Sequence, residues 1–98
     1  MCGITGFLAV EADVTNGEAI ASAMADRIRH RGPDGHGAWS DQAAGYAVAH
    51  RRLSILDLSP AGSQPMHSSD GRWVLAYNGE IYNHLELRVR LQAEGRAP

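Results

Sequence analysis

The sequence contains one cysteine among its 98 residues, so an internal disulfide cannot form. A lone thiol fits a reducing compartment. No apolar stretch is long enough to cross a bilayer, and the first residues lack the basic-then-apolar layout of a secretory signal peptide. These absences predict a cytoplasmic protein that has no membrane partner.

An excess of charge of either sign is also missing. The net charge is −2 and the pI is about 6.2, which does not indicate a nucleic acid or an anionic membrane surface as a partner. The five histidines show no metal-ligand spacing. Gly35 and Gly37 are too few, and follow no strand, to form a phosphate-binding loop. We therefore predict no metal and no cofactor in this chain.

The sequence does contain short apolar stretches and two amphipathic segments. Residues 4–10 (ITGFLAV) predict a buried strand. A helix is predicted over residues 16–29, with Thr15 and Glu18 as a capping box at its start. A spacing of four residues predicts its apolar face, which comprises Ile20, Met24 and Ile28.

The rest of the chain predicts more strands and a second helix. The strands are expected at residues 37–40, 46–51, 53–56 and 73–77. Turn or loop sequences separate them, at residues 41–45, 58–65 and 70–71. The second helix is expected over residues 83–94, with Leu87 and Leu91 on one face. This order predicts an α+β fold of antiparallel sheets covered by helices.

Cys2 is the first candidate for chemistry because of its position. Removal of Met1, which is normal before a small residue, would leave the thiol beside its own α-amine. Such an amine titrates near pH 7.7–8.0 in the unperturbed state, so its neutral form can act as the base for the thiol. Cys2 alone fits a buried, inert thiol in the first strand equally well.

Two further segments have both a structural and a functional interpretation. Asn78-Gly79 is typical of a tight turn, but it follows an apolar strand, where an amide side chain and a backbone N–H could form an oxyanion hole. Arg51-Arg52 lies between apolar segments. It is either a surface charge pair or the source of one guanidinium that grips a carboxylate, since adjacent strand residues face opposite ways.

The HRGPD segment, residues 30–34, ends the first predicted helix at its Gly-Pro pair. Its charged flanks fit either a solvated loop or a loop that closes over a substrate.

In combination, these residues resemble the class II glutamine amidotransferase domain, and within it the asparagine synthetase branch. Four segments carry the resemblance in the same order: MCGI at the start, HRGPD, RLSILD at residues 52–57 and YNGEIYN at residues 77–83. PAGSQPM at residues 60–66 also resembles that branch, although Ser63 stands where a histidine is frequent. The implied fold is the N-terminal part of the four-layer αββα sandwich of N-terminal-nucleophile hydrolases.

The resemblance also implies roles for individual residues. Cys2 attacks the side-chain amide of L-glutamine, and Asn78 and Gly79 stabilise the oxyanion. Arg52, and not Arg51, grips the substrate carboxylate, while Glu80 lies near the substrate's α-ammonium. The remaining residues implied to line the glutamine pocket are Leu53, Ser54, Ile55 and Leu56.

The chain departs from the family by ending before a Gly-Ser/Thr-Asp segment that binds the α-ammonium. We therefore expect residues 1–98 to be a partial amidotransferase domain, although a small complete domain is the alternative. The expected partner is a C-terminal synthetase domain, which uses ATP and magnesium to amidate aspartate. Two alternatives stay open: an amidotransferase for another acceptor, and an inactive, truncated remnant.

Overall fold

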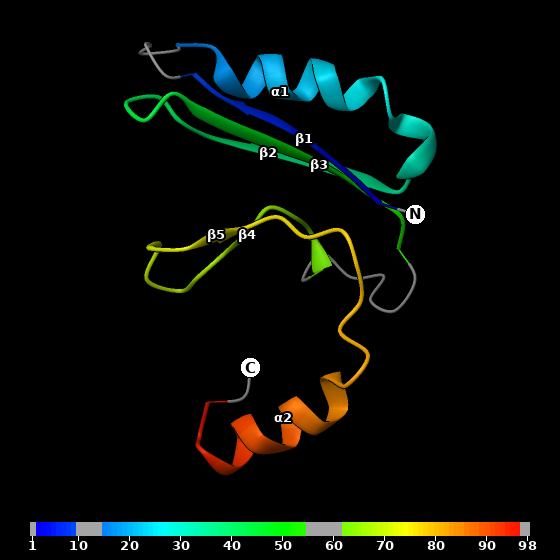
Figure 1. The fold of residues 1–98 in the computed structure, drawn as a ribbon, viewed down its shortest axis with the longest axis vertical. Helices are drawn as coiled ribbons and strands as arrows, with labels where there is room; N and C mark the ends of the chain where they lie inside the picture. The colour runs from blue at the N-terminus through cyan, green and yellow to red at the C-terminus, as the bar shows by residue number, and fades with distance from the viewer. Residues whose placement is uncertain (1, 10–14, 55–61, 97–98) are drawn as a thin grey trace.

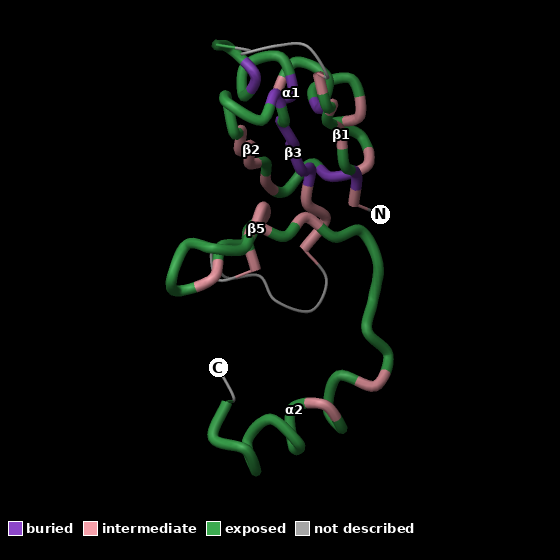
Figure 2. Tube along the Cα trace, turned by 60° about the vertical axis from the view of Figure 1, so that its left-hand side comes forward, coloured by how far each residue is buried: buried purple, intermediate pink, exposed green. Residues whose placement is uncertain are grey.

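The computed structural model of the chain describes residues 2–9, 15–54 and 62–96. Its centre is an antiparallel sheet of three strands, β1 (Gly3–Leu8), β2 (Gly35–Asp41) and β3 (Tyr46–Arg52), in the order β1-β3-β2. Each of these three strands overlaps a predicted one. The middle strand, β3, has neighbours on both edges and layers on both faces, so it is buried over most of its length (Figure 2).

Helix α1 (Gly17–Asp26) covers one face of this sheet (Figure 1). Its buried positions are Gly17, Ala21 and Ala25, and the two alanines form a core with Ala47 and Ala49 of β3. The predicted apolar face was wrong, because Ile20 and Met24 are each 38% exposed. Small side chains four residues apart face the sheet instead, since they let the helix approach its backbone closely.

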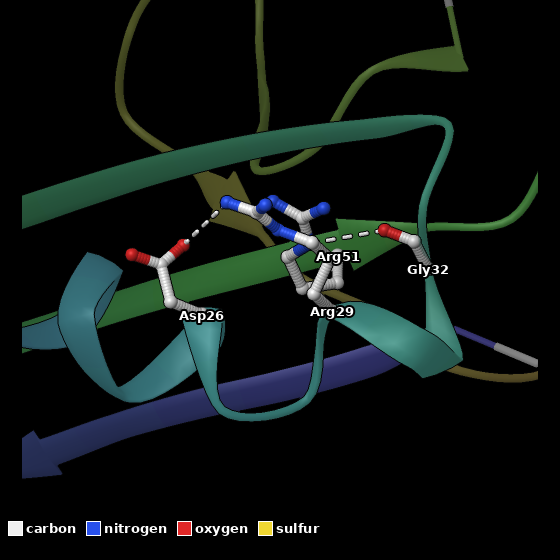
Figure 3. A network of polar contacts seen from close by, with 4 residues as sticks. All are labelled: Asp26, Arg29, Gly32 and Arg51. Carbon is white, nitrogen blue, oxygen red and sulfur yellow. Dashed lines mark hydrogen bonds and ion pairs between the residues drawn. The ribbon is translucent and has the colours of Figure 1, made fainter.

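The ends of α1 also differ from the prediction. Asn16, and not Thr15, is the N-cap residue, and no side chain caps the helix there. The helix ends at Asp26, and a short 3₁₀ helix, η1 (Arg29–Arg31), follows it. An exposed ion pair of 3.8 Å between Asp26 and Arg29 spans the junction (Figure 3). Such a pair contributes little to stability.

The opposite face of the sheet is crossed by residues 62–79. This segment includes a short hairpin of β4 (Met66–His67) and β5 (Val74–Leu75), so the predicted strand 73–77 is shorter than expected. Gly37 of β2 packs directly against the carbonyl of Gln64. Beyond the hairpin, the backbone N–H of Tyr77 donates to Oε1 of Gln64 at 2.6 Å. These contacts fix the two ends of the segment to each other and to the sheet.

The second helix, α2 (His84–Ala93), agrees with its prediction to within one residue at each end. In Figure 1 the layers run from α1 through the three-stranded sheet and the β4–β5 hairpin to α2. The α+β organisation expected from the sequence, with antiparallel sheets and two α-helices, is confirmed. No helix in the described residues is both long and apolar enough to cross a membrane.

Helix α2 stands away from the other layers. Its only half-buried residue is Leu87, and Leu85 and Val89 are mostly exposed. The radius of gyration of 15.1 Å exceeds the roughly 13 Å typical of a compact chain of this length. The accessible surface of 7211 Å² likewise exceeds the roughly 5,400 Å² of a folded monomer of this mass. The described layers therefore leave much apolar surface uncovered.

Candidate active site

The register of the central sheet assigns the candidate residues to its two faces. Ala47 and Ala49 of β3 pack toward α1, so alternation directs Val48, His50 and Arg52 to the face that residues 62–79 cross. On the adjacent strand, Gly3 is opposite Arg51. The residue before it, Cys2, therefore stands level with Arg52 and shares its face.

The thiol of Cys2 lies against the residue that follows β3. The backbone N–H of Leu53 donates to Cys2 Sγ at 3.4 Å, and Sγ is 3.8 Å from the Leu53 carbonyl oxygen. Nε of Arg31 donates to the Cys2 carbonyl at 3.2 Å. Both the main chain and the thiol of Cys2 are thus held by neighbours that are distant in sequence. Cys2 is half-buried and therefore lies outside the fully buried core.

The two adjacent arginines have different surroundings. Arg51 is buried on the α1 side, where its Nε donates to the Gly32 carbonyl at 3.0 Å (Figure 3). Arg52 is half-buried on the opposite face, beside the Cys2 position. Opposite orientations are what adjacent strand residues require. Only Arg52 therefore faces the side on which Cys2 lies.

The HRGPD segment packs along the end of β3. A Cβ on Gly32 would overlap the peptide bond between Arg51 and Arg52, so the two backbones are in direct contact. The backbone N–H of Asp34 donates to the Arg52 carbonyl at 2.9 Å. Oδ2 of Asp34 accepts the N–H of Ser54 at 2.8 Å. The sequence singled out this segment, but it did not predict the hydrogen bonds by which Asp34 holds the backbone at the end of β3.

Asn78 and Gly79 come directly after the point at which the crossing segment contacts β3. There, Nε2 of His50 lies 3.2 Å from the carbonyl oxygen of Tyr77. Asn78, Gly79 and Glu80 are all exposed. A Cβ on Gly79 would lie 2.7 Å from the Tyr77 hydroxyl oxygen, so the turn folds back on the Tyr77 ring.

His50 is a residue that sequence reasoning did not single out. It is fully buried, and its Nδ1 has no hydrogen-bond partner among the described residues. Burial lowers the pKa of His50, the hydrogen bond to the Tyr77 carbonyl opposes this effect, and the charge of Arg52 lowers the pKa further. The neutral imidazole is therefore favoured. The alternation of Val48, His50 and Arg52 along one strand was the available signal.

The structure therefore brings part of the predicted site to one end of the sheet. Cys2, Arg52 and Leu53 are neighbours there, and His50 links β3 to the segment that leads into Asn78 and Gly79. Ile55 and Leu56, which were predicted to line the pocket, lie outside the described residues. In the parts of the chain that the structure describes, no three His, Cys, Asp or Glu side chains are grouped as metal ligands.

Comparisons with known proteins agree with the geometry. The family profile described as "Glutamine amidotransferase domain" matches residues 1–97. Asparagine synthetase B [glutamine-hydrolyzing] of Escherichia coli is 42% identical over 91% of this chain. Asparagine synthetase [glutamine-hydrolyzing] 1 of Saccharomyces cerevisiae is 44% identical over 90% of it. Amidase chry2 of Gibberella zeae is 37% identical over 96% of it.

The chain spans only 15–16% of the length of these three relatives. The matches nevertheless cover nearly all of the chain, and they include every segment that carried the resemblance. They are consistent with the antiparallel sheets and two α-helices of the structure. The chain therefore belongs to the glutamine amidotransferase domain family.

Proposed function

We propose that this chain supplies the nucleophile and part of the substrate pocket for hydrolysis of L-glutamine to glutamate and ammonia. The observation that carries the proposal is the position of Cys2. Its thiol lies against the backbone of Leu53, on the face that Arg52 shares, and the segment that leads into Asn78 crosses this same face at His50. Hydrolysis of the amide needs a nucleophile, a cation that binds the substrate carboxylate, and hydrogen-bond donors that stabilise the oxyanion.

The reaction begins once Met1 has been removed. The α-amine of Cys2 takes the thiol proton, and Sγ attacks the side-chain carbonyl carbon of glutamine. The Asn78 side chain and the Gly79 N–H stabilise the resulting oxyanion. The carbon–nitrogen bond then breaks, and ammonia leaves with the proton that the amine returns. Water hydrolyses the γ-glutamyl thioester, which releases glutamate and restores the thiol of Cys2.

The substrate grip rests on Arg52 and on the backbone that follows it. The guanidinium of Arg52 pairs with the glutamine α-carboxylate. The N–H groups of Leu53 and Ser54 are already bonded to Cys2 Sγ and Asp34. The Leu53 carbonyl oxygen lies 3.8 Å from Cys2 Sγ, and a carbonyl oxygen has a second lone pair for a ligand. Carbonyl oxygens and the Glu80 carboxylate suit the α-ammonium. Ile55 and Leu56 complete the proposed lining.

The site that would bind the acceptor of the ammonia is proposed to lie in a part of the protein outside this chain. The named asparagine synthetases, each 42–44% identical, favour ATP-dependent amidation of aspartate to asparagine. A C-terminal synthetase domain would then be the partner and would bind ATP and magnesium. Such a partner, with the rest of the amidotransferase domain, would also cover the apolar surface that the described layers leave exposed.

A different acceptor is the second candidate, and the amidase of Gibberella zeae, at 37% identity, favours it. Glutamine hydrolysis by Cys2 is common to both candidates. An inactive remnant is the third, and the experiment below separates it from both.

The test is covalent labelling of the chain by 6-diazo-5-oxo-L-norleucine, an electrophile that mimics glutamine, followed by peptide mass spectrometry. We expect loss of Met1, one label on Cys2 and protection by glutamine. Arg52→Gln should weaken the protection, whereas Arg88→Gln on the exposed surface of α2 should leave it intact. Labelling of wild-type Cys2 that glutamine does not slow would overturn the proposed function and favour the inactive remnant.

A further inference from the structure

His50 has a bonding pattern that packing alone does not explain. It has no exposed surface, yet its Nδ1 lacks a hydrogen-bond partner among the described residues. Its other ring nitrogen, Nε2, lies 3.2 Å from the Tyr77 carbonyl oxygen. A carbonyl oxygen only accepts hydrogen bonds, so Nε2 must carry the hydrogen. The ring is thus a neutral imidazole that donates from Nε2 and leaves a bare lone pair at Nδ1.

The described residues around the His50 ring come from three strands and from the segment that crosses the sheet. Across the sheet, Ile4 is opposite His50 on β1 and Gly37 is opposite it on β2. The Gln64 carbonyl packs against Gly37, and the Tyr77 carbonyl oxygen meets the ring at Nε2. The charged group that acts on His50 is Arg52, two residues along the same face of β3. Among the described residues, the neighbours Ile4, Gly37 and Gln64 carry no charge.

A buried polar atom without a hydrogen-bond partner destabilises a fold. An apolar side chain of similar size at position 50 would avoid that loss. Position 50 is nevertheless a histidine, and its Nε2–H donates to the carbonyl of Tyr77, the residue before Asn78. The proposed oxyanion donors, Asn78 and Gly79, are themselves exposed. The bond from the central strand to the Tyr77 carbonyl, together with the bond of the Tyr77 N–H to Gln64, therefore anchors the residue that precedes them.

We propose that His50 is a positioning residue, which acts through the Tyr77 carbonyl to hold Asn78 and Gly79 over the end of the sheet where Cys2 and Arg52 lie. This inference rests on the proposed glutamine hydrolysis and deepens it. It requires the neutral ring, because a proton on Nδ1 would create a buried cation near Arg52, and no described residue offers an acceptor to that nitrogen. Acid should therefore loosen the turn before it unfolds the chain.

The test compares two substitutions in the full chain. In His50→Gln, the amide nitrogen reaches the position of Nε2 and keeps a donor without a titrating ring. In His50→Leu, the volume is similar and the donor is lost. His36→Gln is the matched control, because His36 is an exposed histidine on the neighbouring strand β2.

The first readout is the rate of Cys2 labelling by the glutamine-mimicking electrophile, separated into a saturation constant and a maximal rate. We expect His50→Leu to lower the maximal rate by about tenfold to a hundredfold, the effect of a small misplacement of catalytic groups. The saturation constant should change little. His50→Gln should stay within about threefold of wild type, since the donor is retained. Equal maximal rates in His50→Leu and wild type would overturn the inference.

The second readout is the ratio of the wild-type rate to the His50→Gln rate across pH. Any effect of pH on the chemistry of Cys2 itself is common to both proteins and cancels in the ratio. We expect the ratio to fall below pH 6.5, the ordinary pKa of histidine. A ratio that is constant with pH would count against the inference even if His50→Leu fails to fold.

The third readout does not depend on Cys2 reactivity. In ¹⁵N–¹H spectra, we expect the backbone amide signals of Asn78 and Gly79 to move with protonation of the His50 ring, and to stay still in His50→Gln. Ring protonation that leaves these signals unchanged would overturn the inference. If the spectra behave as expected while wild-type Cys2 is not labelled, the positioning role stands and the proposed glutamine hydrolysis fails.

Discussion

The carboxylate of Asp34 accepts a hydrogen bond from the backbone N–H of Ser54 at 2.8 Å, while its own N–H donates to the Arg52 carbonyl at 2.9 Å. The two bonds bracket Leu53, the residue whose N–H points to the Cys2 thiol. Asp34 thereby holds the backbone beside the proposed nucleophile. A residue of the HRGPD segment thus acts on the site through the main chain.

Replacement of Asp34 by alanine should destabilise the chain by about 1–2 kcal/mol, since a hydrogen bond to a charged group is lost. Asp34→Asn should have a smaller effect because an amide oxygen still accepts a bond. Urea unfolding followed by circular dichroism measures the change. Asp26→Asn is the control, since its exposed ion pair with Arg29 should contribute less than about 1 kcal/mol. Equal midpoints for Asp34→Ala and Asp26→Asn would contradict this account.

Gly32 and Gly35 offer a matched pair for the contact between the HRGPD segment and β3. A Cβ on Gly32 would overlap the Arg51–Arg52 peptide, whereas one on Gly35 would lie 3.7 Å from the nearest side-chain atom of Arg52, an ordinary contact. We expect Gly32→Ala to destabilise by about 1–3 kcal/mol or more, as overpacking does. Gly35→Ala should have an effect of less than about 1 kcal/mol. Thermal unfolding of both variants measures the difference, and equal losses would rule out the overlap as its cause.

The close approach of α1 to the sheet predicts that large side chains are not tolerated on its inner face. Ala21 is fully buried, so Ala21→Leu should destabilise by about 1–3 kcal/mol through overpacking. Ala19 is exposed on the same helix, so Ala19→Leu should stay within about 0.5 kcal/mol of wild type. Chemical denaturation separates the two. The packing assignment fails if Ala19→Leu proves the more damaging substitution.

The lowered pKa of His50 predicts how stability depends on pH. The unfolded chain binds a proton at the ordinary pKa of 6.5, while burial keeps the folded ring neutral to lower pH. The unfolded state therefore binds more protons below pH 6.5, and the free energy of unfolding should fall as pH drops through that range. Above pH 6.5 the contribution of His50 is constant. His50→Gln should lack this part of the pH dependence in urea unfolding at several pH values, and an unchanged slope in that variant would refute the assignment.

The proposed oxyanion donor has its own control in the chain. Asn78→Ala should lower the maximal rate of glutamine-dependent chemistry at Cys2 by about a hundredfold to a thousandfold. Asn83 is the N-cap residue of α2 and makes no side-chain cap hydrogen bond, so Asn83→Ala should leave that rate unchanged. Ammonia release from glutamine, or labelling of Cys2, measures both. A loss of similar size in both variants would point to the segment as a whole rather than to the Asn78 amide.

The central sheet and both α-helices were predictable, whereas β4 was not, and residues 53–54 of the predicted strand 53–56 are not in a strand. The inner face of α1 was not predictable either. Apolar strength and spacing favoured Ile20 and Met24, whereas the structure buries Gly17, Ala21 and Ala25. Alanines on β3 leave room for a helix that itself presents only small side chains. Which face of the helix is buried thus depends on the surface of the sheet, and the periodicity of the helix sequence carries no information about that surface.

Candidate residues could be named from the sequence where a motif has an ordered set of neighbours, as with Cys2, Arg52 and Asn78, and their roles stay predictions. The proximity of Cys2 to Arg52 followed only from the register of β1 on β3. His50 and Asp34 were missed because each acts through a backbone group of a distant residue, Tyr77 or Ser54. Such bonds leave no pattern of residue types to detect.

Strand β3 presents alanines to α1 from one face, and His50 and Arg52 to the proposed site from the other. The spacing of side chains along a strand is two residues, so insertion or deletion of a single residue in β3 would exchange these faces. The imidazole and the guanidinium would then be driven into the helix interface. Both the helix interface and the proposed site therefore constrain the length of β3. Insertions or deletions in this strand should be tolerated only when they comprise two residues.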